Sequence, residues 1–352
     1  MEKLQIQKFG ITKDGSKPYL YKMKNDAGME VQVSDFGATL VNVTVLDQDK
    51  NPVEVVLGYE DAAGYENGTA AIGAIVGRNA NRIGGACVTI NGIDYKLAEN
   101  DGKNNLHSGP DVYQKRMWRV VENGDDHVTF LLHSPDGDQG YPGALDMKVT
   151  YTLDEENGLT IHYEAVPDQD TVINMTNHSY FNLNGHKSGS VLHHRMQLLS
   201  DAFTPADAQS IPTGEVCSVD GTPMDFRSTK ELGAEIDAAY EPLILGNGYD
   251  HNWVLNTKGD VTRKCATLES PLTGIVLDVY TNEPGIQVYA GNFLDGSLTG
   301  KKGITYNQRA SVCLETQKYP DTPNKPEWPS AVLRPGEKYM SQCIFKFSVN
   351  KN

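Results

Sequence analysis

The sequence has few cysteines, no long apolar run and little sign of helix. Its five cysteines are odd in number, widely spaced and form no Cys-x-x-Cys pair. This pattern argues against a disulfide framework or a zinc knuckle and favours reduced thiols. No stretch of about 18 apolar residues occurs, and the N-terminus has no apolar region of the kind that a secretory signal carries. We therefore expect a cytoplasmic protein that does not bind membranes.

Basic residues are also in short supply. Lysine and arginine number 31 against 46 aspartates and glutamates, which gives a net charge of −15. Such an acidic balance opposes phosphate backbones, so nucleic acid is not an expected partner. No Gly-rich loop with nucleotide-binding spacing follows a strand pattern, and no linker or composition break divides the chain. We expect one domain, residues 1–352.

Apolar and polar residues alternate along much of the chain, as in strands with one buried face. The clearest case is the pair of runs at 147–153 and 159–165, joined by turn residues, which predicts a β-hairpin. Similar runs lie at 30–46, 53–58, 118–132, 264–281 and 338–349. They predict an all-β protein, a large antiparallel β-sandwich with few short helices.

Two segments favour helix. In residues 228–239, Ser228 and Glu231 have capping-box spacing before an apolar face, and a second short helix is expected near Asp61. Residues 319–329 carry a proline at every third position. We interpret them as an ordered, stiffened loop that could form a pocket wall, with a polyproline II ligand as the alternative.

The segment Asn174–Leu183 crowds a histidine, a phenol, hydroxyl groups and three carboxamides into ten residues. Because each sugar hydroxyl both donates and accepts, mixed side chains of this kind suit a polyhydroxylated ligand. Glu315 ends the apolar run Ala310–Leu314, where partial burial should raise the pKa of its carboxyl toward that of a useful general base. A buried structural glutamate is the alternative.

Two patterns resemble metal sites without completing one. Asp136–Gly140 begins like a calcium loop, but Met147 stands where that loop needs a bidentate glutamate, so we interpret the segment as a turn. His186, His193 and His194 have no ordered partners, and we expect them in a solvent-exposed loop. We predict no metal site.

All ten positions of Asn174–Leu183 match the histidine signature of the galactose mutarotase (aldose 1-epimerase) family. The chain resembles that family in further elements, in the expected order: Gly77–Gly84, Asn104–Gly109, Ser134–Gly143, Asp250–Trp253, Gly285–Tyr289 and Leu314–Asp321. The resemblance covers nearly the whole chain. It implies a galactose mutarotase-like sandwich and an enzyme that interconverts the α and β anomers of free hexoses such as galactose and glucose.

The resemblance also implies a role for each site residue. Glu315 takes the proton from O1 of the sugar, His178 donates to the ring oxygen O5, and His107 is a nearby hydrogen-bond partner and second candidate donor. The residues that it implies for sugar binding are Asn81, Arg82, Tyr180, Asp250 and Gln287. No cofactor is implied. The expected partner is a monosaccharide, and the expected assembly is a monomer or weak homodimer.

Three other functions stay open at this point. A sugar-phosphate epimerase would need an extra basic cluster, and a carbohydrate-binding module would need no acid–base pair. A glycoside hydrolase would need two carboxylates, for which Asp250 could join Glu315. A surface ion pair is the simpler interpretation of Arg82, and a turn-forming side chain is that of Asp250.

Overall fold

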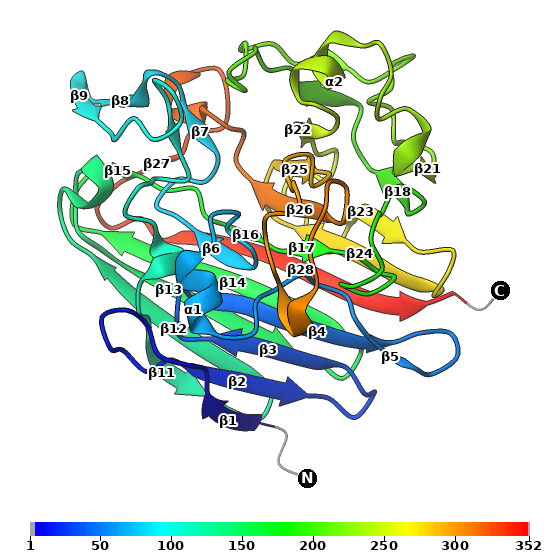
Figure 1. Cartoon of the computed structure of the whole chain (residues 1–352). Coiled ribbons are helices and arrows are strands. Elements are labelled where there is room, and N and C mark those ends of the chain that lie inside the picture. The colour runs from blue at the N-terminus through cyan, green and yellow to red at the C-terminus, as the bar shows by residue number, and fades with distance from the viewer. Residues whose placement is uncertain (1–3, 351–352) are drawn as a thin grey trace.

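The structure, a computed structural model, describes residues 4–350, and its regular secondary structure is mostly β (Figure 1). Every pair of named strands in this part of the chain is antiparallel, and its only α-helices are α1 (Ala62–Asn67) and α2 (Glu241–Leu245). The predicted all-β class with few short helices is confirmed. The two ends of the predicted domain, 1–3 and 351–352, lie outside the described residues. No helix between 4 and 350 is long and apolar enough to cross a membrane.

Three large sheets form the framework. The five-stranded sheet has the order β1 (Leu4–Lys8), β2 (Tyr19–Lys24), β3 (Glu30–Ser34), β4 (Thr39–Leu46), β5 (Pro52–Glu54). The nine-stranded sheet has the order β11 (Arg119–Asn123), β12 (His127–Ser134), β13 (Leu145–Leu153), β14 (Gly158–Pro167), β28 (Tyr339–Val349), β24 (Ile275–Thr281), β23 (Lys264–Glu269), β18 (Arg195–Leu198), β21 (Lys230–Glu231). The six-stranded sheet has the order β17 (Tyr180–Phe181), β26 (Val312–Gln317), β25 (Gly285–Tyr289), β22 (Asp250–Val254), β19 (Ala202–Thr204), β20 (Cys217–Ser218).

Short two-stranded ladders complete the architecture. They are β6 (Ala74–Val76) with β16 (Thr176–His178), β7 (Arg82–Ile83) with β10 (Asn105–Leu106), β8 (Cys87–Ile90) with β9 (Ile93–Lys96), and β15 (Thr171–Val172) with β27 (Val332–Leu333). Two of these ladders hold segments of the predicted site motifs next to each other, because β6 pairs with the strand that ends at His178 and β7 begins at Arg82.

The three sheets pack on one apolar core. It takes fully buried residues from each of them, for example Val31 of β3, Ile161 of β14 and Val288 of β25. In Figure 1 the five-stranded sheet (blue) lies at the bottom of the view, β28 (red) crosses the middle, and β25 and β26 lie above it. Burial of this apolar surface is the main favourable term in folding.

Two local predictions are confirmed. Strands β13 and β14 form the expected hairpin, with Leu153 opposite Leu159, and Asp154 Oδ1 closes the turn by accepting from the Gly158 amide at 2.7 Å. Asp61 caps α1, where its Oδ1 accepts from the Gly64 amide at 3.1 Å. In both places an aspartate side chain accepts a hydrogen bond from a backbone amide at the end of a strand or helix.

The predicted helix at 228–239 is wrong. Residues Lys230–Glu231 instead form the edge strand β21, followed by a single 3₁₀ turn at Leu232–Ala234. The Leu232 amide donates to His194 O at 2.9 Å, and the Gly233 amide donates to Leu192 O at 2.8 Å. Amides that a helix would use are therefore taken by distant partners, and tertiary pairing overrides the local capping signal.

The prediction of an exposed loop for the three clustered histidines is wrong for two of them. His186 and His194 are buried, and only His193 is exposed. His194 Nε2 accepts from the Leu183 amide at 2.9 Å, and His186 Nδ1 lies 3.3 Å from the Tyr306 hydroxyl. Each buried ring has a hydrogen-bonding role in the fold, as buried polar groups normally do.

A long loop, residues 291–310, joins β25 to β26 and is called the rim loop below. Its tip descends toward β4 and β5 (orange in Figure 1). At the tip, the Lys301 amide donates to Gly58 O at 2.9 Å, and Lys301 Nζ donates to Asn42 Oδ1 at 2.7 Å and lies 3.2 Å from Glu54 Oε2. The Tyr306 hydroxyl donates to the same Gly58 carbonyl. The loop is thus tied to the five-stranded sheet.

The buried Lys301 should make stability depend on pH in a definite direction. Burial lowers the pKa of Lys301 from 10.5 to about 8, although Glu54 opposes this. Between these pH values the unfolded chain holds a proton that the folded chain has released. The free energy of unfolding should therefore rise across the window by about 2–3 kcal/mol relative to Lys301→Met. Urea unfolding at several pH values measures the difference.

Lys302→Met is the matched control. Lys302 lies next in the same tip and also pairs with Glu54, but it is exposed and that pairing raises its pKa. Its contribution to stability should fall, not rise, as the pH increases. Parallel pH profiles for wild type and Lys301→Met would contradict the burial of a titrating amine.

Candidate active site

A cavity of about 330 Å³ opens above the six-stranded sheet and collects most of the predicted site residues. Seven of the eight line it: Asn81, Arg82, His107, His178, Tyr180, Asp250 and Glu315. The eighth, Gln287, lines a small neighbouring hollow instead. Segments separated by more than two hundred residues in sequence therefore meet at one cavity.

The innermost pair in this cavity is His178 and Glu315. His178 ends β16 and Glu315 lies within β26, and their side chains are only 8 % and 3 % exposed. His178 Nε2 lies 3.7 Å from Glu315 Oε1. The other carboxylate oxygen, Oε2, is buried and has no hydrogen-bond partner. Since buried polar atoms are nearly always paired, this oxygen is available to a ligand that enters the cavity.

Burial sets the protonation of this pair. It raises the pKa of the Glu315 carboxyl well above its ordinary value, an effect that Asp250 increases and Arg82 opposes. Burial also lowers the pKa of His178 to about 4. The predicted upward shift for Glu315 is confirmed in direction. Burial therefore favours the neutral form of both groups.

His107 is held by the backbone of Asn81. Its Nδ1 accepts from the Asn81 amide at 3.1 Å, and its own amide donates to Asn81 O at 2.9 Å. Both residues have positive φ, +60° at Asn81 and +52° at His107. Burial lowers the pKa of His107 well below its usual value, with help from His178 and Arg82. Because a backbone amide can only donate, the neutral ring carries its proton on Nε2.

Arg82 and Asp250 are fixed by neighbouring polar groups. Arg82 Nε donates to Asp101 Oδ2 at 2.7 Å, so the ion pair considered from the sequence exists, yet Arg82 also lines the cavity. Asp250 begins strand β22, not a turn, and its Oδ1 accepts from Gln287 Nε2 at 2.8 Å. Burial raises the pKa of Asp250, while Arg82 and Gln287 lower it. Gln287 does not line the cavity itself, but its hydrogen bond holds Asp250, which does.

Aromatic rings form part of the wall. Tyr180 stacks on His178 with ring centroids 4.9 Å apart and an angle of 18°, and its hydroxyl donates to Ala70 O at 2.6 Å. Tyr289 meets both rings edge-on, and Phe293 stacks on Tyr289 at the mouth, where it is 62 % exposed. Such faces suit the C–H side of a sugar ring.

Sequence reasoning missed two parts of the site, the segment 69–71 and the rim loop. The rim loop contributes Phe293, Leu294, Asp295, Ser297 and Leu298 to the cavity. The available signal for this loop was a polar, glycine-rich connection between two apolar strands, and such loops often carry binding residues. The proline-rich loop at 319–329 is ordered as expected, but it contributes only Pro320, and to the neighbouring hollow.

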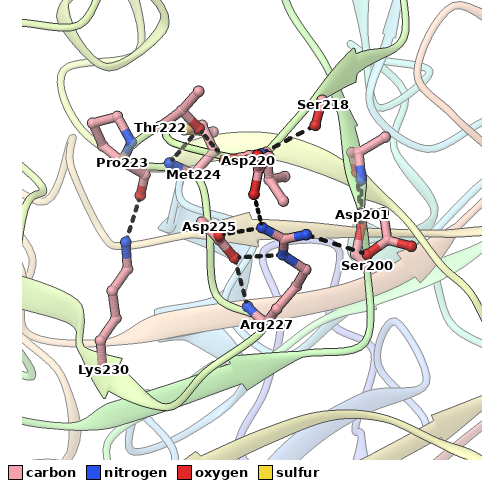
Figure 2. A network of polar contacts seen from close by, with 12 residues as sticks. Ser200, Asp201, Ser218, Asp220, Thr222, Pro223, Met224, Asp225, Arg227 and Lys230 are labelled. Carbon is pink, nitrogen blue, oxygen red and sulfur yellow. Dashed lines mark hydrogen bonds and ion pairs between the residues drawn. The ribbon is translucent and has the colours of Figure 1, made fainter.

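A second cavity, of about 360 Å³, provides a useful contrast. It is lined by residues of the paired strands β18 and β23 and by Arg227, whose guanidinium pairs with Asp220 at 2.5 Å and Asp225 at 2.6 Å (Figure 2). Asp201, 3.9 Å from Arg227, also accepts from Asn256. None of the residues described around this cavity has a buried side-chain oxygen or nitrogen without a partner. No buried polar atom of these described residues is thus free for a ligand, unlike Glu315 Oε2 in the first cavity.

Comparison with known proteins identifies close relatives. The family model for aldose 1-epimerase matches residues 19–346. The chain is 43 % identical to a galactose mutarotase from Bos taurus over 332 residues, covering 94 % of each protein. It is 40 % identical to an aldose 1-epimerase from Escherichia coli K12 over 340 residues, covering 96 % of this chain and 97 % of that one.

Solved structures agree with the sequence matches. An aldose epimerase homologue from C. elegans superposes with a TM-score of 0.88 at 32 % identity, covering 94 % of this chain and 99 % of that one. A galactose 1-epimerase from Lactobacillus acidophilus NCFM superposes with a TM-score of 0.87 at 29 % identity, with both chains fully covered. The fold is thus the galactose mutarotase-like one that the sequence implied.

The contact between Asn81 and His107 predicts a specific ring tautomer. At about pH 6.5 the His107 ring should be neutral with Nδ1 unprotonated, because the Asn81 amide occupies that nitrogen. Nitrogen-15 NMR of the histidine rings distinguishes the tautomers, and His107→Gln assigns the signal by its disappearance. A signal from protonated Nδ1 would contradict this geometry.

Proposed function

The chain belongs to the aldose 1-epimerase family, and on that premise we propose that it interconverts the α and β anomers of free hexoses such as galactose and glucose. The epimerase activity follows from the family, whereas the choice of sugar is the proposal. The relatives include galactose mutarotases at 40–43 % identity, which supports galactose. The observation that carries the mechanism is the buried pair His178 and Glu315, with Nε2 and Oε1 3.7 Å apart.

Their separation suits the reaction because the two reacting oxygens, O1 and O5, are bonded to the same carbon atom. A base and an acid that act on them together must stand side by side. We assign Glu315 to remove the proton from O1 and His178 to donate a proton to O5, which opens the ring to the aldehyde. Rotation about C1–C2 turns the carbonyl, and the ring then closes with the proton transfers reversed.

Burial of the pair favours the step that opens the ring. Opening starts from an ionised Glu315 and a protonated His178, and it ends with both groups neutral. Burial stabilises the neutral forms, since it raises the pKa of Glu315 and lowers that of His178. The positive charge of Arg82 works in the other direction and keeps the ionised carboxylate accessible. One proton stays within the pair, so none has to be exchanged with solvent during turnover.

The remaining residues orient the sugar. Arg82 provides donors, Asp250 provides acceptors, and His107 provides an Nε2–H donor, all of them on the cavity wall. Asn81 and Gln287 hold His107 and Asp250 in place, and Tyr180 supplies a stacking surface for His178. Fixing the substrate in this way can contribute as much to the rate as the proton transfers do.

Among the described lining residues, Arg82 is the only lysine or arginine, while Asp250, Asp295 and Glu315 are acidic. A phosphate group would face more negative than positive charge there, so a sugar-phosphate substrate is disfavoured. The acid–base pair and the family together favour an epimerase over a binding module or a glycoside hydrolase.

We also propose that the chain acts as a single domain, residues 1–352, and as a monomer or weak homodimer in the cytoplasm. In support, one apolar core takes residues from Tyr21 to Phe347. The five cysteines are free. Free thiols of this kind persist in reducing compartments.

Removal of the base should abolish most of the rate. Glu315→Gln should lower kcat by about 10²- to 10⁴-fold, because general-base assistance is lost while the amide keeps nearly the same shape. Polarimetry on freshly dissolved α-D-galactose and α-D-glucose measures the relaxation, and calorimetry should still detect sugar binding. His178→Asn should behave in the same way. A rate within about threefold of wild type would remove Glu315 from its assigned role.

Two charge substitutions should move the pH profile of kcat/KM in opposite directions. Arg82→Ala removes a charge that lowers the pKa of Glu315, so the midpoint of the profile should move to higher pH, by on the order of 1 on the pH scale. Asp250→Asn removes a charge that raises this pKa, so the midpoint should move to lower pH. The two apparent pKa values of the profile belong to Glu315 and His178 as a coupled pair. Each substitution should move the acidic limb and the basic limb of the profile in the same direction.

Lys346→Ala serves as the control. Lys346 lies on β28, outside the cavity lining, and forms an exposed ion pair with Glu156, so the substitution also removes one positive charge. Its profile should coincide with that of wild type. Movements of the same sign in Arg82→Ala and Asp250→Asn would contradict the electrostatic assignment, whatever their effect on KM.

A further inference from the structure

A third reactive side chain lies beside the acid–base pair and has no part in the proton transfers. Cys313 precedes Glu315 by two residues on β26, so both side chains project from the same face of the strand. One ligand atom from each of His178, Cys313 and Glu315 lies within 4.8 Å of the other two, and all three residues are buried. A thiol, an imidazole and a carboxylate thus converge at one point, and the last two also line the cavity.

We propose that this trio binds a soft divalent cation such as Zn²⁺ or Cd²⁺, and that the bound ion inhibits the enzyme by excluding the sugar. Sulfur, nitrogen and oxygen ligands together are typical of zinc, and the sulfur selects it over Mg²⁺ or Ca²⁺. Three protein ligands leave the fourth position of a tetrahedral ion to water, which could reach it from the cavity that His178 and Glu315 line.

The positions of the three groups permit coordination with little rearrangement. The 3.7 Å between His178 Nε2 and Glu315 Oε1 is close to the separation of two ligands on one tetrahedral ion. An ion between the three groups would reach bond lengths of about 2.0–2.3 Å after side-chain shifts of less than about 1 Å. Glu315 Oε2 has no hydrogen-bond partner to give up.

The chemistry of binding balances without any redox step. The cation displaces the proton of the Cys313 thiol and that of the Glu315 carboxyl, and both protons leave to solvent. One thiolate and one carboxylate then neutralise the two positive charges, so the buried complex carries no net charge. Among neighbouring groups, Asp250 attracts the ion and Arg82 opposes it, as they do for a proton on Glu315.

Direct binding of Cd²⁺ to the full-length enzyme tests the proposal independently of the catalytic roles assigned above. Coordination by Cys313 should produce an ultraviolet thiolate-to-cadmium charge-transfer band at a stoichiometry of one, and added galactose should displace the ion. Activity should fall as the band grows and return with a chelator. In Cys313→Ala the band should be absent and the affinity at least about tenfold weaker, since even outer-shell partners contribute that much.

Cys343→Ala is the matched control, because Cys343 is also a free, buried cysteine, on β28. It should retain the band and the inhibition, each compared with the activity of the same variant without metal. The proposal is overturned if Cys343→Ala loses the band, if Cys313→Ala binds Cd²⁺ as tightly as wild type, or if galactose leaves the bound ion in place. If the wild-type enzyme binds no Cd²⁺ but has normal epimerase activity, the metal proposal fails and the proposed function stands.

Discussion

The site depends on the burial of a carboxyl group beside an imidazole. Water would hold Glu315 ionised and would leave it a weak base, whereas the closed inner end of the cavity raises its pKa and lowers that of His178. A tenfold change in the acid dissociation constant corresponds to about 1.4 kcal/mol between the two protonation states. The surrounding charges tune this balance, because Asp250 and Arg82 act on Glu315 in opposite directions. In the proposed mechanism, the fold contributes to the chemistry by burying these two neighbouring side chains away from water.

Much of the fold could be predicted from period-two alternation. The runs around 147–165 became the expected hairpin of β13 and β14, because one buried face dictates both the strands and their pairing. The helix expected at 228–239 failed for a physical reason that no local pattern contains. Its amides are bonded to the carbonyls of Leu192 and His194, residues some forty positions away in sequence. Local propensity cannot report such partners.

The candidate site likewise contains residues that could be predicted from the sequence and residues that could not. Glu315, His178 and Arg82 could be found because their motifs are contiguous in sequence and their chemistry is unusual for their surroundings. The rim loop could not, since Leu294 and Leu298 are ordinary residues that matter only through the fold that carries them to the cavity. Burial of His186 beside Tyr306 was missed for the same reason, as the two residues are far apart in sequence.

The cavity wall draws on segments near residues 70, 81, 107, 178, 250, 295 and 315, so no fragment of the chain contains it. The segment at 70–71 comes from the first quarter of the sequence, and Glu315 from the last. Contacts between segments so far apart are slow to form, because the entropy of closing the long loops must be paid first. Epimerase activity therefore requires the whole fold, and a measurement of activity also measures the fraction of the chain that is folded.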